Sequence, residues 1–87
     1  MAFVEIYTKD YCPYCDKAKL LLDQLGVDYT EHDLTAEPAK FDELLLRRPG
    51  ARTVPQIFIN DLGIGGCDDL YDLHDSGQLK PMLAKLD

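Results

Sequence analysis

The stretch AFVEIYTKDYCPYCDKAKLLLDQLG, residues 2–26, decides the fold. Residues 2–8 are rich in β-branched and aromatic side chains with partial alternation, which predicts a β-strand. Between Pro13 and Leu25 the apolar residues recur at helical spacing, and Gly26 is a typical helix stop. The stretch therefore predicts a strand that leads, through a short loop carrying two cysteines, into a helix.

The remaining chain predicts three more strands and three more helices. In the second helix, Thr35 is the expected N-cap and Pro38 is tolerated in the first turn. The expected strands are residues 27–34, 55–60 and 64–66, and the expected helices are residues 35–48, 68–74 and 78–86.

The element order is therefore β-α-β-α-β-β-α(α). A strand, helix and strand joined by short connections favour a parallel pair with a right-handed crossover, and the later hairpin adds antiparallel strands. We expect an α/β protein with a mixed four-stranded β-sheet flanked by helices. The length of 87 residues suits one domain, spanning 1–87.

Composition narrows the classes of function. The net charge is −7, and the one local cluster of positive charge is Arg47, Arg48 and Arg52, so nucleic-acid binding is not expected. No apolar run is long enough for a transmembrane helix, and the first residues do not resemble a signal peptide. We therefore expect a cytoplasmic protein that does not bind membranes.

Cys12 and Cys15 could form a metal clamp, a structural disulfide or a redox centre. A metal site needs further ligands, and only Cys67, His32 and His74 are available for it, without a second CxxC motif. A disulfide across three residues would constrain little of the unfolded chain. A close cysteine pair in a reducing compartment is more often catalytic or metal-binding than structural, and the metal site lacks ligands, so the redox interpretation is favoured.

The position of the pair at a helix start suits thiol–disulfide exchange. Cys12 would be the N-cap, where unpaired N–H groups and the helix dipole stabilise a thiolate. Cys15 would lie one turn further in, on the same face and less exposed. Pro13 stiffens the turn between them. The expected chemistry is attack by Cys12 followed by resolution through Cys15.

Three separated segments resemble the glutaredoxin family: CPYC at 12–15, TVP at 53–55 and GGCDDL at 65–70. Their order and spacing match the family along essentially the whole chain, and small bacterial dithiol glutaredoxins are the most similar type. The resemblance implies the thioredoxin fold and a glutathione-dependent thiol–disulfide oxidoreductase. Alternatives within this resemblance are an electron donor reduced by thioredoxin reductase, and an iron–sulfur cluster carrier.

The resemblance also implies roles for individual residues. Cys12 would be the nucleophile, Cys15 the resolving thiol, and Val54–Pro55 a cis-proline loop whose Val54 backbone pairs with glutathione. The N–H groups of Cys67 and Asp68 would bind the γ-glutamyl carboxylate. The glutathione-binding residues that the resemblance implies are Lys9, Tyr14, Thr53, Val54, Pro55, Gly66, Cys67, Asp68 and Asp69.

Other positions are less defined. Family members that hold the glycyl carboxylate with a long side chain on the second helix have Asp42 as the nearest match here, so Lys40, Arg48 or Arg52 would have to substitute. The sulfur of Cys67 is interpreted as a small buried apolar group. Glutathione is the expected cosubstrate and no metal is expected. The expected partners are glutathionylated or disulfide-containing proteins, with ribonucleotide reductase as a family example, and the expected state is a monomer.

Overall fold

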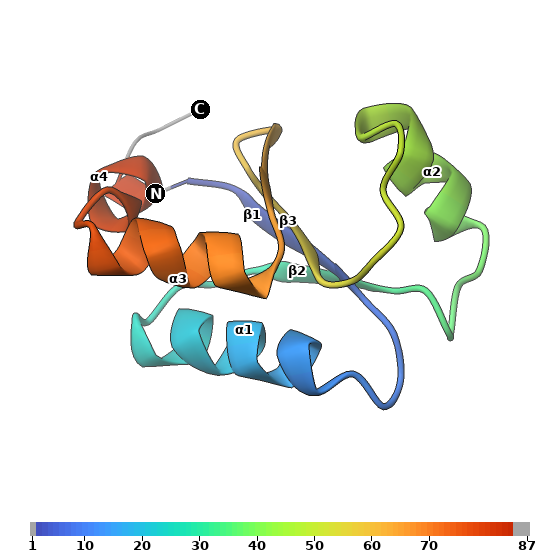
Figure 1. Ribbon diagram of the computed structural model, residues 1–87, viewed down its shortest axis with the longest axis horizontal. Coiled ribbons are helices and arrows are strands. Elements are labelled where there is room, and N and C mark those ends of the chain that lie inside the picture. Colours follow the sequence, from blue (N-terminus) through green and yellow to red (C-terminus); the bar gives the residue numbers. More distant parts are fainter. Residues whose placement is uncertain (1, 85–87) are drawn as a thin grey trace.

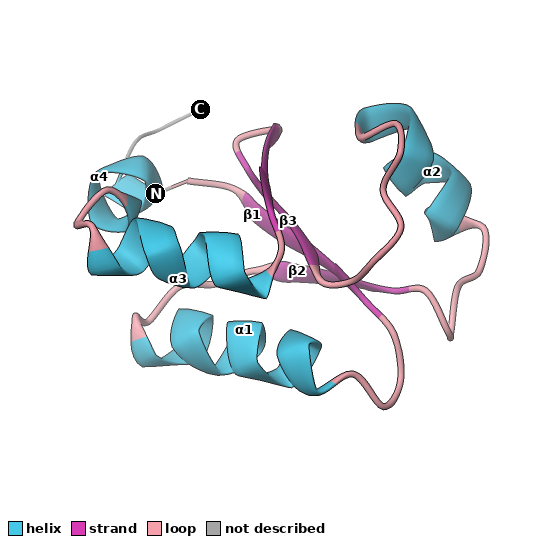
Figure 2. Ribbon diagram, viewed as in Figure 1, coloured by secondary structure: helices cyan, strands magenta, loops and turns pink. Residues whose placement is uncertain are grey.

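The computed structural model describes residues 2–84. Its elements follow the expected order (Figure 1; Figure 2). The strands are β1 (Val4–Thr8), β2 (Thr30–Asp33), β3 (Gln56–Ile59) and β4 (Leu62–Gly65). The helices are α1 (Pro13–Gln24), α2 (Lys40–Arg47), α3 (Cys67–Asp75) and α4 (Leu79–Ala84).

The four strands form one mixed sheet in the order β2-β1-β3-β4, which confirms the expected sheet. β1 pairs with β2 in parallel and with β3 antiparallel, and β3 pairs antiparallel with β4. Tyr7, near the end of β1, is the pairing partner of Gln56, the first residue of β3. The end of β1 and the start of β3 therefore lie side by side, at the same end of the sheet.

The sheet separates two apolar clusters. Ile57 and Ile59 of β3 pack into the larger cluster with buried residues of α1, α3 and α4. Phe58 points to the opposite face and packs with Tyr7 and Leu44 in a smaller cluster under α2. The alternation of side chains along β3 thus gives three layers, with α1 and α3 on one face of the sheet and α2 on the other (Figure 1).

The first three strands and the first two helices are shorter than the sequence suggested, and one predicted cap is wrong. β4 begins at Leu62, not at residue 64, and α3 extends beyond the predicted range 68–74 at both ends. α2 begins at Lys40, with Ala39 at the N-cap position, and not near Thr35. The backbone N–H of Thr35 donates to Asp33 Oδ1 at 2.9 Å, and its hydroxyl accepts from the Asp10 N–H at 3.0 Å. Asp33 forms a turn with the residues after it, and Pro38 disfavours a helical conformation at the residue before it. Residues 35–38 therefore lie outside the helix.

The chain's last segment is only partly described. The expected helix at 78–86 appears as α4 (Leu79–Ala84), and Lys85 and Leu86 lie outside the described residues. Of the described helices, none has both the length and the apolarity to cross a bilayer.

Polar contacts fix α2 to the sheet. Arg47 donates to both oxygens of the buried Glu5 carboxylate, at 3.0 and 2.7 Å, and its guanidinium lies 3.9 Å from the ring centre of Phe58. His32 Nε2 lies 3.2 Å from the same carboxylate. Burial acts to raise the pKa of Glu5, but the hydrogen bonds with Arg47 and His32 outweigh it, so the pKa is lowered. Leu44 is the buried apolar residue of α2. The ion pair between Arg47 and Glu5 therefore supplies much of the attachment of α2 to the sheet.

We expect Arg47→Met to lower the free energy of unfolding by about 2–4 kcal/mol, because it leaves the Glu5 carboxylate buried without its charged partner. Lys80→Met, which removes an exposed cation of α4, is the control and should change it little. A lowered pKa in the folded state stabilises the fold above the usual pKa of 4.5, and that contribution is lost as the pH falls through the folded value. Urea unfolding should therefore show a gap between wild type and Arg47→Met that narrows in acid. Equal effects of the two substitutions would contradict this assignment.

Candidate functional site

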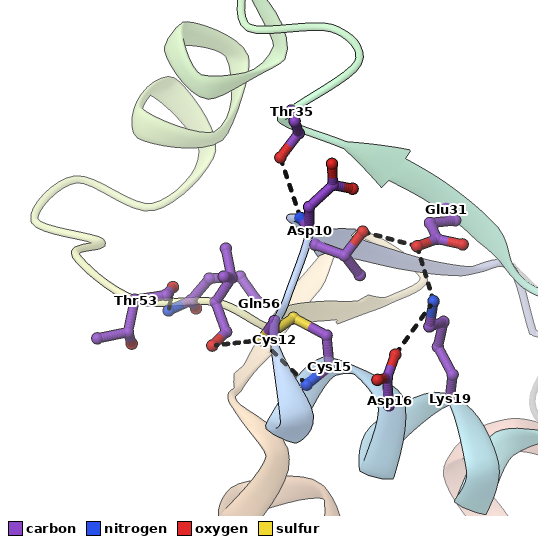
Figure 3. The surroundings of a disulfide bond; sticks show 11 residues. Asp10, Cys12, Cys15, Asp16, Lys19, Glu31, Thr35, Thr53 and Gln56 are labelled. Carbon is purple, nitrogen blue, oxygen red and sulfur yellow. Dashed lines mark hydrogen bonds and ion pairs between the residues drawn. A yellow bond between two sulfur atoms is a disulfide. The ribbon is translucent and has the colours of Figure 1, made fainter.

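The two cysteines lie at the start of α1, as the sequence predicts. Cys12 is the N-cap residue, and the backbone N–H of Cys15 donates to its sulfur at 3.1 Å. A disulfide joins the two residues (Figure 3). Cys15 is 1% exposed and Cys12 is 9% exposed, which confirms that Cys15 is the deeper of the pair. The arrangement suits a nucleophile at position 12 and a resolving thiol at position 15.

The loop before β3 faces the cysteine pair. The Val54–Pro55 peptide bond is cis, as the resemblance implied. The Cys12 sulfur lies 3.7 Å from the Val54 carbonyl oxygen. Any group bonded to the Cys12 sulfur therefore lies beside the Val54 backbone.

The start of α3 forms the opposite wall of the site. Gly66 is the N-cap residue, and the Asp69 carboxylate reaches back to accept its N–H at 2.9 Å. Gly65, which has a φ of 110°, precedes it, and a Cβ there would overlap the Asp69 carboxylate. Glycine is therefore favoured at position 65, because of its backbone conformation and because an added side chain would displace the Asp69 carboxylate.

A pocket of about 400 Å³ lies between this loop and α3, and we call it the loop–helix pocket. It brings together eight of the nine residues expected to bind glutathione. Its lining residues are Tyr14, Arg48, Thr53, Val54, Pro55, Gln56, Gly65, Gly66, Cys67, Asp68 and Asp69. Cys12 does not line it but borders it through the contact with Val54.

Lys9 is the one expected residue outside the loop–helix pocket. It lines a neighbouring pocket of about 330 Å³ together with Arg52, and the two pockets share Thr53 and Val54. We call this the basic pocket. Of the three cations considered for the glycyl carboxylate, Arg52 lies in the basic pocket and Arg48 in the loop–helix pocket, while Lys40 pairs with Glu43 at 3.4 Å.

Gly65 lines the pocket beside Gly66, and both belong to the GGCDDL segment, where the resemblance implies a close approach of the chain to the ligand. Gln56 is the one lining residue that was not singled out from the sequence. Gln56 directly follows Val54–Pro55, but an isolated glutamine at a strand start gives no functional signal. Its position in the pocket becomes visible only in the structure.

The remaining candidate ligands do not add to the site. Cys67 is buried, and burial raises the pKa of its thiol, which agrees with the interpretation of this sulfur as an apolar group. His32 lies against Glu5, and it lines neither of the two pockets. Among residues 2–84, no group of three or more histidine, cysteine or acidic side chains could hold a metal ion.

Comparison with known proteins agrees with this geometry. The glutaredoxin family model matches residues 4–64. Glutaredoxin 3 of Escherichia coli K12 is 53% identical over 95% of this chain and 99% of its own length. The solution structure of Brucella melitensis glutaredoxin has a TM-score of 0.81 at 47% identity, covering 95% of this chain and 89% of that one. The crystal structure of a buckwheat glutaredoxin–glutathione complex has a TM-score of 0.82 at 39% identity, covering 94% and 76%.

The chain belongs to the glutaredoxin family and has its thioredoxin-like fold. It is a glutathione-dependent thiol–disulfide oxidoreductase whose redox pair is Cys12–Cys15. The resemblance seen in the three sequence segments is therefore confirmed.

We expect Gly65→Ala to destabilise the protein by about 1–3 kcal/mol more than Gly77→Ala, because an added Cβ displaces the Asp69 carboxylate from the Gly66 N–H. Gly77 also has a positive φ, of 81°, but nothing lies within 4 Å of an added Cβ, so it isolates the backbone contribution of about 1–2 kcal/mol. Chemical denaturation of both variants makes the comparison. Equal destabilisation would show that the Asp69 contact does not hold the start of α3.

Proposed function

We propose that the loop–helix pocket and the basic pocket together bind one glutathione molecule across Val54. The main supporting observation is that eight expected binding residues line one pocket, and that the Cys12 sulfur lies beside Val54 at its border. A glutathione joined to Cys12 would lie along the Val54 backbone, whose N–H and C=O suit an extended peptide as a β-ladder does. The buckwheat relative, solved with glutathione, supports this ligand.

The γ-glutamyl end would lie at the start of α3. Backbone N–H groups at a helix start favour a carboxylate, and those of Cys67 and Asp68 are the first in α3. Asp69 already accepts from the Gly66 N–H, so the exposed Asp68 carboxylate is the better partner for the ligand's ammonium group. Tyr14 would cover this end as a wall of the pocket.

The glycyl end would lie in the basic pocket. Lys9 and Arg52 line it, on the far side of Thr53 and Val54 from α3. Two cations at this point complement a carboxylate in a protein whose net charge is −7. Arg48 lies on the α3 side of Val54 and would face the γ-glutamyl half.

With a glutathionylated protein, Cys12 alone is sufficient. Its thiolate attacks the glutathione sulfur, the old disulfide breaks, and the substrate thiolate leaves and takes up a proton. A second glutathione thiolate then attacks the glutathione sulfur held on Cys12. Glutathione disulfide departs and the Cys12 thiolate is restored, so each turnover consumes one free glutathione, and the other half of the glutathione disulfide comes from the substrate.

With a protein disulfide, both cysteines are needed. Cys12 attacks one substrate sulfur and forms a mixed disulfide, and the other substrate sulfur leaves as a thiolate. Cys15 then attacks the Cys12 sulfur, which releases the second substrate thiolate and leaves the Cys12–Cys15 bridge. Two glutathione molecules reduce that bridge. The buried position of Cys15 suits a thiol that reacts only with its neighbour.

This chemistry uses thiols throughout, so we propose a reaction without a metal. We further propose that the protein acts as a monomer and a single domain in the cytoplasm, where reduced glutathione is available. Its partners would be glutathionylated and disulfide-containing proteins.

The test is an assay that couples a glutathionylated peptide to glutathione, glutathione reductase and NADPH. Cys12→Ser should abolish turnover, because it removes the attacking sulfur. Cys15→Ser should retain turnover of the glutathionylated peptide but lose activity on a protein disulfide. Lys80→Met serves as the control, because this exposed residue of α4 lines neither pocket and should leave both activities unchanged. Activity of Cys12→Ser, or loss of both activities with Cys15→Ser, would contradict these roles.

A further inference from the structure

The side-chain amide of Gln56 links the loop before β3 to the sheet, and only one of its two polar atoms is hydrogen-bonded. It is the first residue of β3, is 7% exposed and lines the loop–helix pocket. Its Nε2 donates to the Thr53 carbonyl oxygen at 2.9 Å (Figure 3). Its Oε1 is buried and has no hydrogen-bond partner among residues 2–84. One half of the amide is therefore paired and the other is not.

The paired half closes the turn that contains Val54. In a hydrogen-bonded β-turn, the backbone N–H of the fourth residue donates to the carbonyl of the first. Here the side chain of the fourth residue, Gln56, makes that bond to the first, Thr53. The backbone of Gln56 is itself held by pairing with Tyr7 of β1. The amide thus ties the loop to a fixed strand.

The unpaired half predicts that replacing this glutamine costs little stability. A buried acceptor without a partner costs more free energy than one neutral hydrogen bond contributes. Thr53 is exposed, so water can satisfy its carbonyl when Gln56 does not. A methionine of similar length would fill the same space without burying an unpaired oxygen.

We propose that Gln56 is a positioning residue that holds the Val54 backbone in place for glutathione at the expense of stability. The inference rests on the proposed function, since it assigns Gln56 a role only if Val54 pairs with glutathione. The amide acts through Thr53 and does not itself touch the ligand, because its oxygen is covered and its nitrogen is engaged with the loop.

The first test compares Gln56→Met with wild type and with Gln24→Met, which changes an exposed glutamine of α1. The probe is S-methylglutathione, which cannot form a disulfide, titrated into the reduced proteins by calorimetry. We expect Gln56→Met to bind it about 3- to 10-fold more weakly, the effect of one lost neutral hydrogen bond. Its thermal midpoint should be equal to that of wild type or a few degrees higher. Gln24→Met should change neither quantity.

The second variant, Gln56→Glu, separates positioning from folding. Its carboxylate has the same size but cannot donate to the Thr53 carbonyl, and it places a charge in a buried position. Affinity for S-methylglutathione should fall as in Gln56→Met, whereas the thermal midpoint should now decrease. The two variants therefore shift affinity in the same direction and stability in different directions.

If Gln56→Met binds S-methylglutathione as tightly as wild type, the inference is overturned but the proposed binding site is not. The same holds if the thermal midpoint falls in both variants together with the affinity, because the loss of binding would then follow from unfolding. Failure of the wild-type protein to bind S-methylglutathione would overturn the proposed binding site and this inference with it.

Discussion

The hydrogen bond from the Cys15 N–H to the Cys12 sulfur is the interaction on which the site depends. It makes a sulfur atom the cap of α1, so the same contact begins the helix and places the nucleophile among backbone N–H groups that stabilise a thiolate. It also sets Cys15 one turn deeper, within bonding distance of Cys12. A cap of any other chemistry would start the helix but would leave the protein without its reaction.

The sheet then decides what this sulfur faces. Cys12 lies in the loop that follows the end of β1. β3 runs antiparallel beside β1 and begins directly after Val54–Pro55. β4 is antiparallel to β3 and leads directly into the start of α3. The cysteine loop, the proline loop and the start of α3 therefore meet at one end of the strands. The three sequence segments that resemble glutaredoxins lie far apart in the chain, and this topology explains why they form one pocket.

The sequence was sufficient for the order of elements and the cysteine cap, because each has a local signal: apolar periodicity, and Pro13 after Cys12. Most of the pocket was predicted through the resemblance of three segments to glutaredoxins, and not through a local signal. The sequence was insufficient where a contact depends on distant residues. The N-cap expected at Thr35 is wrong because Asp33 forms a turn first and Asp10 engages the hydroxyl. The ion pair of Glu5 with Arg47 and the bond from Gln56 to Thr53 follow from tertiary packing, and a propensity for helix or strand says nothing about either.

The central claim is that a glutathione bonded to Cys12 lies along Val54 with its γ-glutamyl end at α3. The most direct measurement is the amide NMR spectrum of Cys15→Ser before and after glutathionylation of Cys12, with contacts from the bound glutathione to backbone N–H groups. The account predicts large shifts and direct contacts at Val54, Cys67 and Asp68. Glutathione contacts confined to the opposite side of α3, around Leu62, Leu73 and Met82, would contradict it.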